Sequence, residues 1–145
     1  EYINHELINS YDFKYNEQDN IQEIVFLNIN QSDTLIFTYE YNIVGDLILY
    51  YINGHLRSEF NYTTVENPFY ELSKPYLLNI PVDPNQNETE FITSKNMLSN
   101  SKQYNYDGEL EEHNIYNYIL DSDGYPISGI HIHNGKEVNV TFEYK

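Results

Sequence analysis

Alternation of apolar and polar residues runs through most of the chain and predicts β-strands. In the stretch after Gly54, the side chains of Leu56, Ser58, Phe60 and Tyr62 would share one face, while charged and amide residues occupy the other. Similar runs, rich in β-branched and aromatic residues, predict further strands. These runs are residues 11–15, 21–29, 34–41, 46–52, 102–107, 109–120, 125–133 and 136–145.

Two Asn-Gly pairs interrupt this pattern and predict tight hairpins. Asn53-Gly54 and Asn134-Gly135 each follow an apolar run and precede an alternating strand. A two-residue type I′ turn needs positive φ at both central residues, which Asn and Gly tolerate best. The hairpin of residues 49–62 is therefore expected again at 130–144.

The region from about residue 65 to 100 has a different character. Pro68, Pro75, Pro81 and Pro84 interrupt it, and each lacks the N–H that a strand must donate. A short strand or one turn of helix is expected near its end. Because both flanks show the same strand pattern, we interpret 65–100 as a crossover or cap within one domain, 1–145.

The expected fold is an all-β antiparallel meander of about nine strands. No segment has the periodicity of an amphipathic helix, and most connections are short. The strand Leu47–Ile52 is apolar on both faces, so a flat sheet would leave one of them wet. We therefore expect a strongly curved sheet or open barrel, with a two-sheet sandwich as the alternative.

Composition and charge narrow the classes of function. The formal net charge is -16, from 7 basic and 23 acidic residues, which disfavours binding to nucleic acids and to anionic membrane surfaces. The absence of cysteine excludes disulfides and cysteine-ligated metals. The chain has no apolar run of about 20 residues. The sequence begins at Glu1, with no initiator Met and no signal peptide, so we expect it to be the mature form of a processed protein.

The two hairpin regions, 37–64 and 114–145, share a longer pattern that predicts a worn internal repeat. Each contains a Tyr-x-Tyr pair, a glycine, an isoleucine, Asn-Gly and a Phe-x-Tyr pair. In the first region these are Tyr39, Tyr41, Gly45, Ile48, Asn53, Gly54, Phe60 and Tyr62, and in the second Tyr116, Tyr118, Gly124, Ile127, Asn134, Gly135, Phe142 and Tyr144.

This pattern resembles the closing unit of a family of uncharacterised secreted lipoproteins from gut Bacteroides and, more distantly, the tyrosine–aspartate repeats of Rhs-type wall proteins. Asn67-Pro68-Phe69 and Ser94-Lys95-Asn96 match two further motifs of the lipoprotein family, and the resemblance covers most of 37–145. It implies export and anchoring in the periplasm or at the outer-membrane surface, through a lipidated cysteine upstream. It implies no catalytic residues.

His131 and His133 are the strongest candidates for metal ligands. They lie two residues apart on an expected strand, so both imidazoles would point to the same face. A third ligand, His113 or Glu112, could come from the neighbouring strand. No metalloprotease-type spacing supports the site, and strand histidines without a metal remain the favoured interpretation, so we assign neither a metal site nor a cofactor.

Two acidic stretches have weaker patterns. Asp83, Asn85 and Asn87 match the first oxygen positions of a calcium loop, but Glu88 and Ser94 replace its required glycine and glutamate. An irregular site at Asp83, Asn85 and Glu88 remains open. The stretch 121–124, Asp-Ser-Asp-Gly, is expected to form a turn.

No catalytic motif is present, and Glu111 and Glu112 would point to opposite faces of a strand. We therefore expect a non-enzymatic structural or binding module of unknown oligomeric state. The chain's 16 tyrosines are expected to hold the sheet together through cross-strand pairs. The alternatives are a carbohydrate- or peptide-binding protein that uses exposed tyrosines, and a hydrolase with an unrecognised pair of carboxylates.

Overall fold

The computed structural model describes residues 2–3, 6–7, 9–29, 32–68, 70 and 94–143. Within these residues nine strands form one antiparallel sheet, and two strands of two residues each, β1 (Tyr2–Ile3) and β2 (Glu6–Leu7), form a separate pair. The large sheet contains β3 (Asn9–Tyr15), β4 (Ile21–Asn28), β5 (Asp33–Tyr41), β6 (Leu47–Ile52), β7 (His55–Glu66), β8 (Asn96–Tyr104), β9 (Leu110–Leu120), β10 (Pro126–His133) and β11 (Lys136–Thr141).

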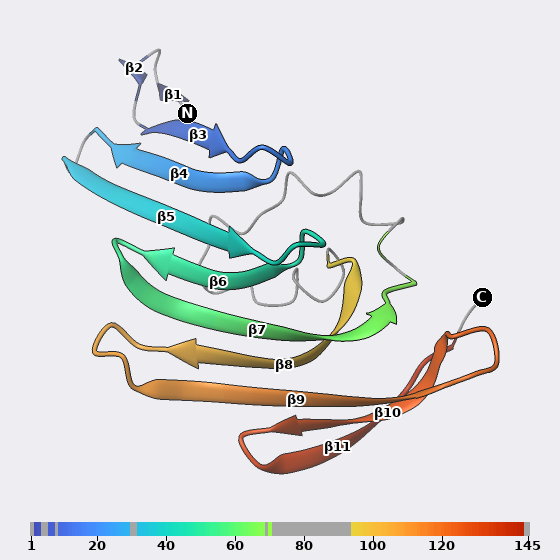
Figure 1. The fold of residues 1–145 in the computed structure, drawn as a ribbon. Coiled ribbons are helices and arrows are strands. Elements are labelled where there is room, and N and C mark those ends of the chain that lie inside the picture. Colours follow the sequence, from blue (N-terminus) through green and yellow to red (C-terminus); the bar gives the residue numbers. More distant parts are fainter. Residues whose placement is uncertain are drawn as a thin grey trace.

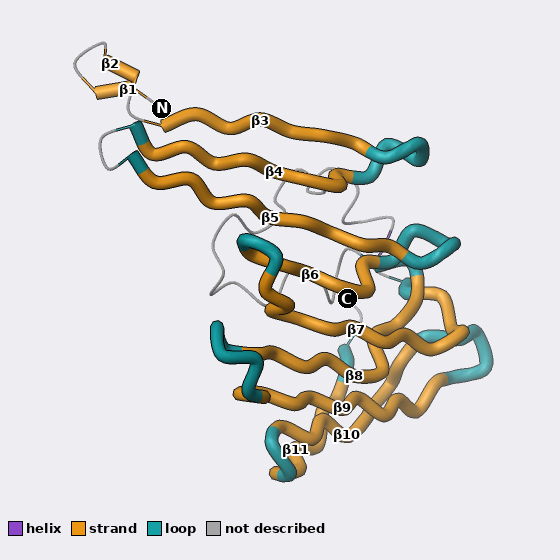
Figure 2. Tube along the Cα trace, turned by 60° about the vertical axis from the view of Figure 1, so that its left-hand side comes forward, coloured by secondary structure: helices purple, strands orange, loops and turns teal. Residues whose placement is uncertain are grey.

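The strand order in the sheet is the order in the sequence, so every strand pairs with its chain neighbours. This confirms the predicted antiparallel meander. The sheet is strongly twisted, and its edge strands β3 and β11 lie at opposite ends of it (Figures 1 and 2). It is curved but not closed into a barrel.

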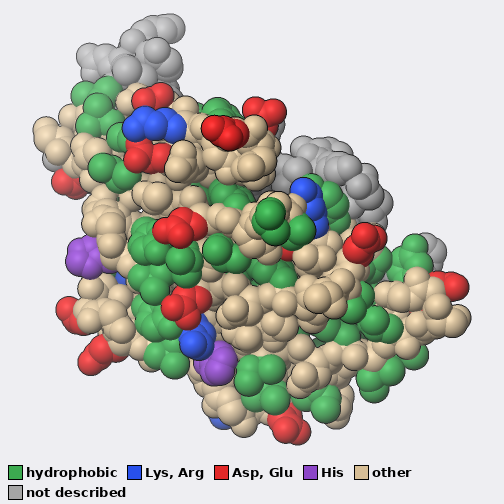
Figure 3. Space-filling view, in the orientation of Figure 1, with side chains coloured by type: hydrophobic (Ala, Val, Ile, Leu, Met, Phe, Trp, Pro, Cys, Tyr) green, Lys and Arg blue, Asp and Glu red, His purple; other side chains and the backbone are tan. Residues whose placement is uncertain are grey.

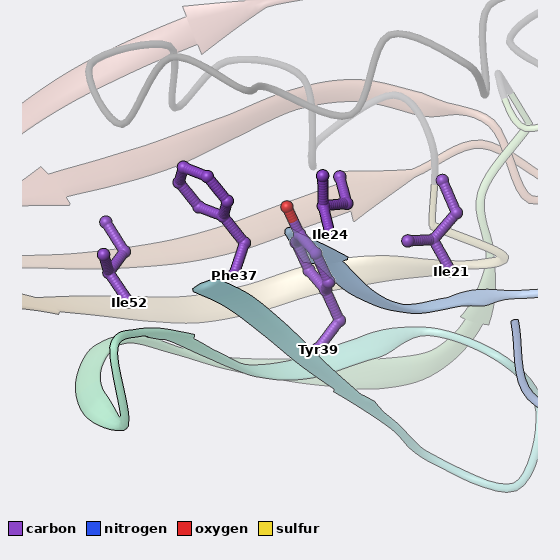
Figure 4. Packing of buried hydrophobic residues seen from close by; sticks show 5 residues of the cluster. All are labelled: Ile21, Ile24, Phe37, Tyr39 and Ile52. Carbon is purple, nitrogen blue, oxygen red and sulfur yellow. The ribbon is translucent and has the colours of Figure 1, made fainter. Parts of the chain in front are cut away.

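The main core lies on one side of β4, β5 and β6. Ile24, Phe37 and Ile52 are each only 1% exposed, and Ile21 and Tyr39 complete the cluster. Figure 4 shows these five side chains rising from the same side of the sheet. Alternation places Phe37 and Tyr39 together on β5, and Phe37 is directly opposite Ile52. On β4 a register shift brings Ile21 and Ile24, three residues apart, to the same side.

Both predicted Asn-Gly hairpins are present, and their asparagines also bind a third strand. Asn53 and Asn134 have φ of 52° and 47°, as a type I′ turn requires. Asn53 N–H donates to Ile36 O at 2.7 Å, and Ile36 N–H donates to Asn53 Oδ1 at 2.8 Å. Asn134 makes the same pair of bonds with His113, at 2.9 and 2.8 Å. Each turn therefore fixes the register of three strands; the internal repeat itself stays a prediction.

The segment interpreted as a cap, 65–100, is shorter at its two described ends, where the strand expected near residue 100 is the beginning of β8; the cap itself stays a prediction. β7 continues to Glu66, and β8 begins at Asn96 rather than near residue 102. Met97 and Leu98, consecutive on β8, are both 4% exposed, so the beginning of this strand is covered on both faces. Pro75, Pro81 and Pro84 lie outside the described residues, as do Phe69 and Tyr144.

A buried carboxylate attaches the turn before β6 to the beginning of β8. Asp46 is 1% exposed, and its Oδ1 accepts the backbone N–H groups of Lys95 and Asn96. Its Oδ2 accepts the side-chain amides of Asn96 at 3.0 Å and Asn42 at 3.3 Å. Four donors thus compensate for the burial of this carboxylate.

The motifs Asn67-Pro68 and Ser94-Lys95-Asn96 meet beside this carboxylate. Asn67 N–H donates to Lys95 O at 2.7 Å, and Asn67 Nδ2 donates to Ser94 O at 2.9 Å. Asn67 and Ser94 are 6% and 4% exposed. The chain therefore leaves β7 and enters β8 at the same buried polar cluster.

We expect Phe37→Ala to lower the free energy of unfolding by about 3–5 kcal/mol, because it removes a buried ring and leaves a cavity in the main core. Urea denaturation followed by far-UV circular dichroism measures the change. Ile43→Ala is the control, since Ile43 is 101% exposed. Equal effects of the two substitutions would contradict this assignment of the core.

Asp46→Asn is expected to destabilise the fold by about 2–3 kcal/mol, because an amide keeps one acceptor oxygen and turns an N–H group toward other donors. The same denaturation assay measures it. Asp121→Asn is the matched control: Asp121 begins a similar turn, in which Oδ1 accepts the N–H groups of Asp123 and Tyr125. An asparagine Oδ1 can accept both bonds, so that change is expected to stay within about 0.5 kcal/mol.

Candidate functional site

A hollow of about 270 Å³ lies at one end of the sheet, between the β6–β7 turn and the β8–β9 turn. The two turns neighbour each other at this end because β7 pairs with β8 (Figure 1). The residues that line the hollow are His55, Leu56, Tyr104, Asn105, Tyr106, Asp107 and Gly108. It is thus an aromatic site with one carboxylate, Asp107, in its lining.

The local sequence forms the β8–β9 wall of the hollow. Asn105 Oδ1 accepts the N–H groups of Asp107 and Glu109, each at 2.9 Å, and its Nδ2 donates to Glu109 at 3.1 Å. Gly108 completes the turn with a φ of 80°, which favours glycine. The side chain of Asn105 is therefore used to shape the turn, which presents Tyr106 to solvent.

Tyr106 is the most accessible aromatic side chain at the hollow, at 58% exposed. The guanidinium carbon of Arg57 lies 4.2 Å from the centre of its ring, a cation–π contact, and the ring of His55 lies edge-on to it at 6.3 Å. Nη1 of Arg57 is buried and has no hydrogen-bond partner among the described residues. Among the described residues, the guanidinium of Arg57 therefore interacts with the ring of Tyr106.

Tyr104 and Glu59 form the polar side of the same region. The Tyr104 hydroxyl donates to Glu59 Oε2 at 3.0 Å, and Lys102 Nζ lies 3.5 Å from the same oxygen. Burial raises the pKa of Tyr104, and the hydrogen bond and the charge of Glu59 raise it further, so this hydroxyl stays protonated and donates. Glu59 therefore accepts a hydrogen bond from Tyr104 and lies beside the ammonium group of Lys102.

His131 and His133 lie on the same face of β10, as predicted, and both contact Asn114 of β9. His131 Nε2 is 2.9 Å and His133 Nδ1 is 2.8 Å from Asn114 Oδ1. Asn114 is 7% exposed, and Tyr116 stacks on His131 with ring centres 4.6 Å apart. A bond to the amide oxygen needs the proton on Nε2 of His131 and on Nδ1 of His133.

The proposed third ligands do not join this pair. Glu112 accepts a hydrogen bond from Gln103 at 3.2 Å, and His113 is adjacent to Asn114 on β9, so its side chain points to the other face. In the part of the chain that the structure describes, no three His, Cys, Asp or Glu side chains cluster closely enough to hold a metal ion. The possible calcium loop at Asp83, Asn85 and Glu88 lies outside the described residues.

The β6–β7 hairpin has an apolar residue at the position that His133 occupies in the β10–β11 hairpin. There, Ile52 precedes Asn53 and faces Phe37, whereas His133 precedes Asn134 and faces Asn114. Sequence reasoning identified the histidines but missed Asn114, because the residue facing them depends on the pairing of β9 with β10.

Several tyrosines hold strands together through their hydroxyl groups. Tyr41 donates to Ile21 O at 2.8 Å, Tyr62 to Leu47 O at 2.7 Å and Tyr118 to Leu98 O at 2.9 Å. Burial raises the pKa of Tyr41 to about 12 and raises that of Tyr118 as well. These residues support the structural interpretation of the tyrosines. The most exposed ones, Tyr106 at 58% and Tyr15 at 53%, belong to separate regions.

The remaining acidic candidates do not gather into a site. Asp121-Ser-Asp-Gly forms the predicted turn, with Asp121 N–H bonded to Tyr125 O at 2.9 Å. On the face seen in Figure 3, acidic side chains are spread among hydrophobic and neutral ones. No helix among the described residues is long and apolar enough to cross a membrane.

Comparison with known proteins finds no matching protein-family model and no matching curated protein. Among solved structures, the chain is similar to a porin-like protein from Bacteroides uniformis, with a TM-score of 0.44 and 15% sequence identity. The match covers 92% of this chain and 56% of that one, so the chain spans little more than half of its length. This similarity does not establish a shared function, and membership of the lipoprotein family stays a prediction.

The histidine pair predicts a pH dependence of stability. Burial lowers the pKa of His131 below its ordinary 6.5, and the charge of His133 lowers it further. The unfolded chain therefore takes up the proton first as the pH falls, and the free energy of unfolding decreases from about pH 6.5 down to the folded-state pKa. Above about pH 6.5, His131 does not change the free energy of unfolding with pH.

Urea denaturation from pH 7.5 to pH 5 measures this effect. His131→Gln is expected to flatten part of the decrease, whereas Ile43→Ala, an exposed substitution that removes no titratable group, is expected to leave the pH profile unchanged. Parallel profiles of wild type and His131→Gln would contradict the role given to His131.

Proposed function

We propose that the protein is a non-enzymatic binding module of an exported, surface-anchored protein, and that a short saccharide binds in the hollow beside Tyr106. One observation carries this proposal: the ring of Tyr106 lines the hollow and is 58% exposed, while contacts with Arg57 and His55 hold it in place. A fixed aromatic ring in a concave site presents a flat apolar surface to a ligand without a further loss of side-chain entropy.

The chemistry of the hollow suits a sugar. An aromatic face packs on the C–H groups of a pyranose, and hydrogen-bonding groups beside it bind the hydroxyls. Asp107 supplies a carboxylate acceptor in the lining, and the lining side chains of Tyr104 and His55 are polar as well. At about 270 Å³ the hollow is at the small end of ligand sites, so it accommodates one or two sugar units rather than a long chain.

Binding without catalysis is favoured by the disposition of the acids. Glycoside hydrolysis uses two carboxyl groups across a cleft, about 5–10 Å apart, and among the described residues the lining of this hollow holds only Asp107. The buried carboxylate of Asp46 is held by four donors. Glu59 is held by Tyr104 and Lys102.

Export to the cell surface is the second part of the proposal. The lack of cysteine and the net charge of -16 are compatible with an exported acidic domain. The resemblance of the Tyr-x-Tyr and Asn-Gly pattern to secreted lipoproteins adds support. A surface location would bring the hollow into contact with extracellular glycans.

Thermal-shift and calorimetric titrations with a panel of mono- and oligosaccharides test the binding proposal. A saccharide at one hundred times its dissociation constant is expected to stabilise the folded chain by about 2.7 kcal/mol, which raises the melting temperature by several degrees. Tyr106→Ala is expected to weaken that binding about ten-fold or more, because it removes the stacking surface.

Tyr125→Ala is the matched control, because Tyr125 is 45% exposed and ends a similar turn elsewhere in the sheet. It is expected to leave the affinity unchanged. Equal losses in both variants would mean that the sugar does not bind at the hollow. A panel without any saturable shift would overturn the proposal and favour a purely structural module, and release of reducing sugar would favour a hydrolase.

A further inference from the structure

The strand β3 forms an edge of the sheet and has backbone groups available for another strand. Among the described strands it pairs only with β4. Asn16 N–H donates to Asn20 O at 2.8 Å across the following turn, so Asn16 faces β4. The backbone of a strand points alternately to its two sides, which directs the N–H and C=O groups of Tyr11, Phe13 and Tyr15 to the outer edge.

The same three residues expose their aromatic side chains. Tyr11, Phe13 and Tyr15 are 42%, 43% and 53% exposed, and alternation places them on one face of β3. The rings of Tyr11 and Phe13 are stacked at 6.5 Å. An edge strand with a row of exposed rings is a surface on which a further strand gains both hydrogen bonds and apolar contacts.

The charges of β3 make it complementary to a second copy of itself. In an antiparallel pair centred on Phe13, Tyr11 lies opposite the second copy's Tyr15, and Asp12 lies opposite the second copy's Lys14. A shift of the register by two residues in either direction brings Asp12 opposite Asp12 or Lys14 opposite Lys14. Opposite charges directly across a ladder stabilise it and like charges destabilise it, so one register is selected.

Lys14 carries its positive charge at this edge in the single chain. Its Nζ lies 2.5 Å from Glu23 Oε1 on β4, and its side chain remains 63% exposed. The hydrogen bond to Glu23 and its charge raise the pKa of Lys14, so the ammonium form persists at neutral pH. A second carboxylate can therefore approach the exposed side of this ammonium.

We propose that two copies of the chain associate through β3, antiparallel and centred on Phe13, so that the two sheets become one continuous sheet. The interface has two-fold symmetry, so Asp12 of each copy lies opposite Lys14 of the other copy. In this register Phe13 pairs with itself at the axis, and the backbone groups of Tyr11 and Tyr15 bond to those of the second copy. In this register residues 11–15 of the two copies lie opposite one another.

Sedimentation velocity over a hundred-fold range of concentration at about 150 mM salt tests this inference. The wild-type chain is expected to shift from monomer to dimer. Asp12→Lys is expected to weaken the dimer about ten-fold, because lysines then face each other at two symmetric places, and Lys14→Asp is expected to do the same with carboxylates. The double variant Asp12→Lys/Lys14→Asp restores the opposite charges and is expected to recover the wild-type constant.

Glu137→Lys is the matched control. It changes the net charge by the same amount as Asp12→Lys, but it lies on β11, the other edge strand. It is expected to leave dimerisation unchanged. If it weakens the dimer as much as Asp12→Lys does, β11 or overall charge governs association and the proposal fails.

Phe13→Asp gives a second readout that leaves the Lys14–Glu23 pair intact. It places two carboxylates at the two-fold axis and is expected to abolish the dimer while far-UV circular dichroism remains that of the wild type. A wild-type chain that stays monomeric at every concentration would overturn the proposal and leave the edge to a strand of another protein. A double variant that is folded but remains monomeric would exclude this register.

Discussion

The arrangement of the sheet depends on the buried carboxylate of Asp46. It bonds to Lys95 and Asn96, which lie 49 and 50 residues further along the chain, whereas each strand ladder joins two strands that are consecutive in the chain. A carboxylate without water is costly unless donors surround it, and the loop ending at Asp46 and the beginning of β8 supply them together. The beginning of β8 is therefore held by one residue in the β5–β6 turn as well as by its ladder with β7.

Most strands could be predicted from the sequence because their alternation and their turns are local. The Asn-Gly hairpins are the clearest case, since Asn and Gly are the residues that best tolerate the positive φ found at Asn53 and Asn134. The first half of β8 is predicted only as a short strand or one turn of helix, because its polar and apolar residues do not alternate. Met97 and Leu98 are both buried, and what makes this segment a strand is its pairing with β7 and the bonds to Asp46, both of which join distant parts of the chain.

The candidate sites were less predictable, for a related reason. That His131 and His133 share a face follows from the two-residue period of a strand, but their contact with Asn114 depends on the register between β9 and β10. The strand predicted over 102–107 includes Tyr106, which lies in the β8–β9 turn. A usable signal is present in the sequence: an Asn or Asp followed by Gly three residues later, as at Asn105–Gly108 and Asp121–Gly124. In the structure Oδ1 of this first residue accepts the N–H groups two and four residues later and so shapes the turn.

The strands lie in the sheet in the same order as in the sequence, and this has an evolutionary consequence. Because every strand of the large sheet pairs with its sequence neighbours, a hairpin gained or lost at either end of the gene segment would extend or shorten the sheet without reassigning any existing pair. The polar turns and the Asn-Gly turns, which carry their own hydrogen bonds, supply ready junctions for such growth. The architecture resembles a repeat array, in which length can change by whole units while the interior stays intact.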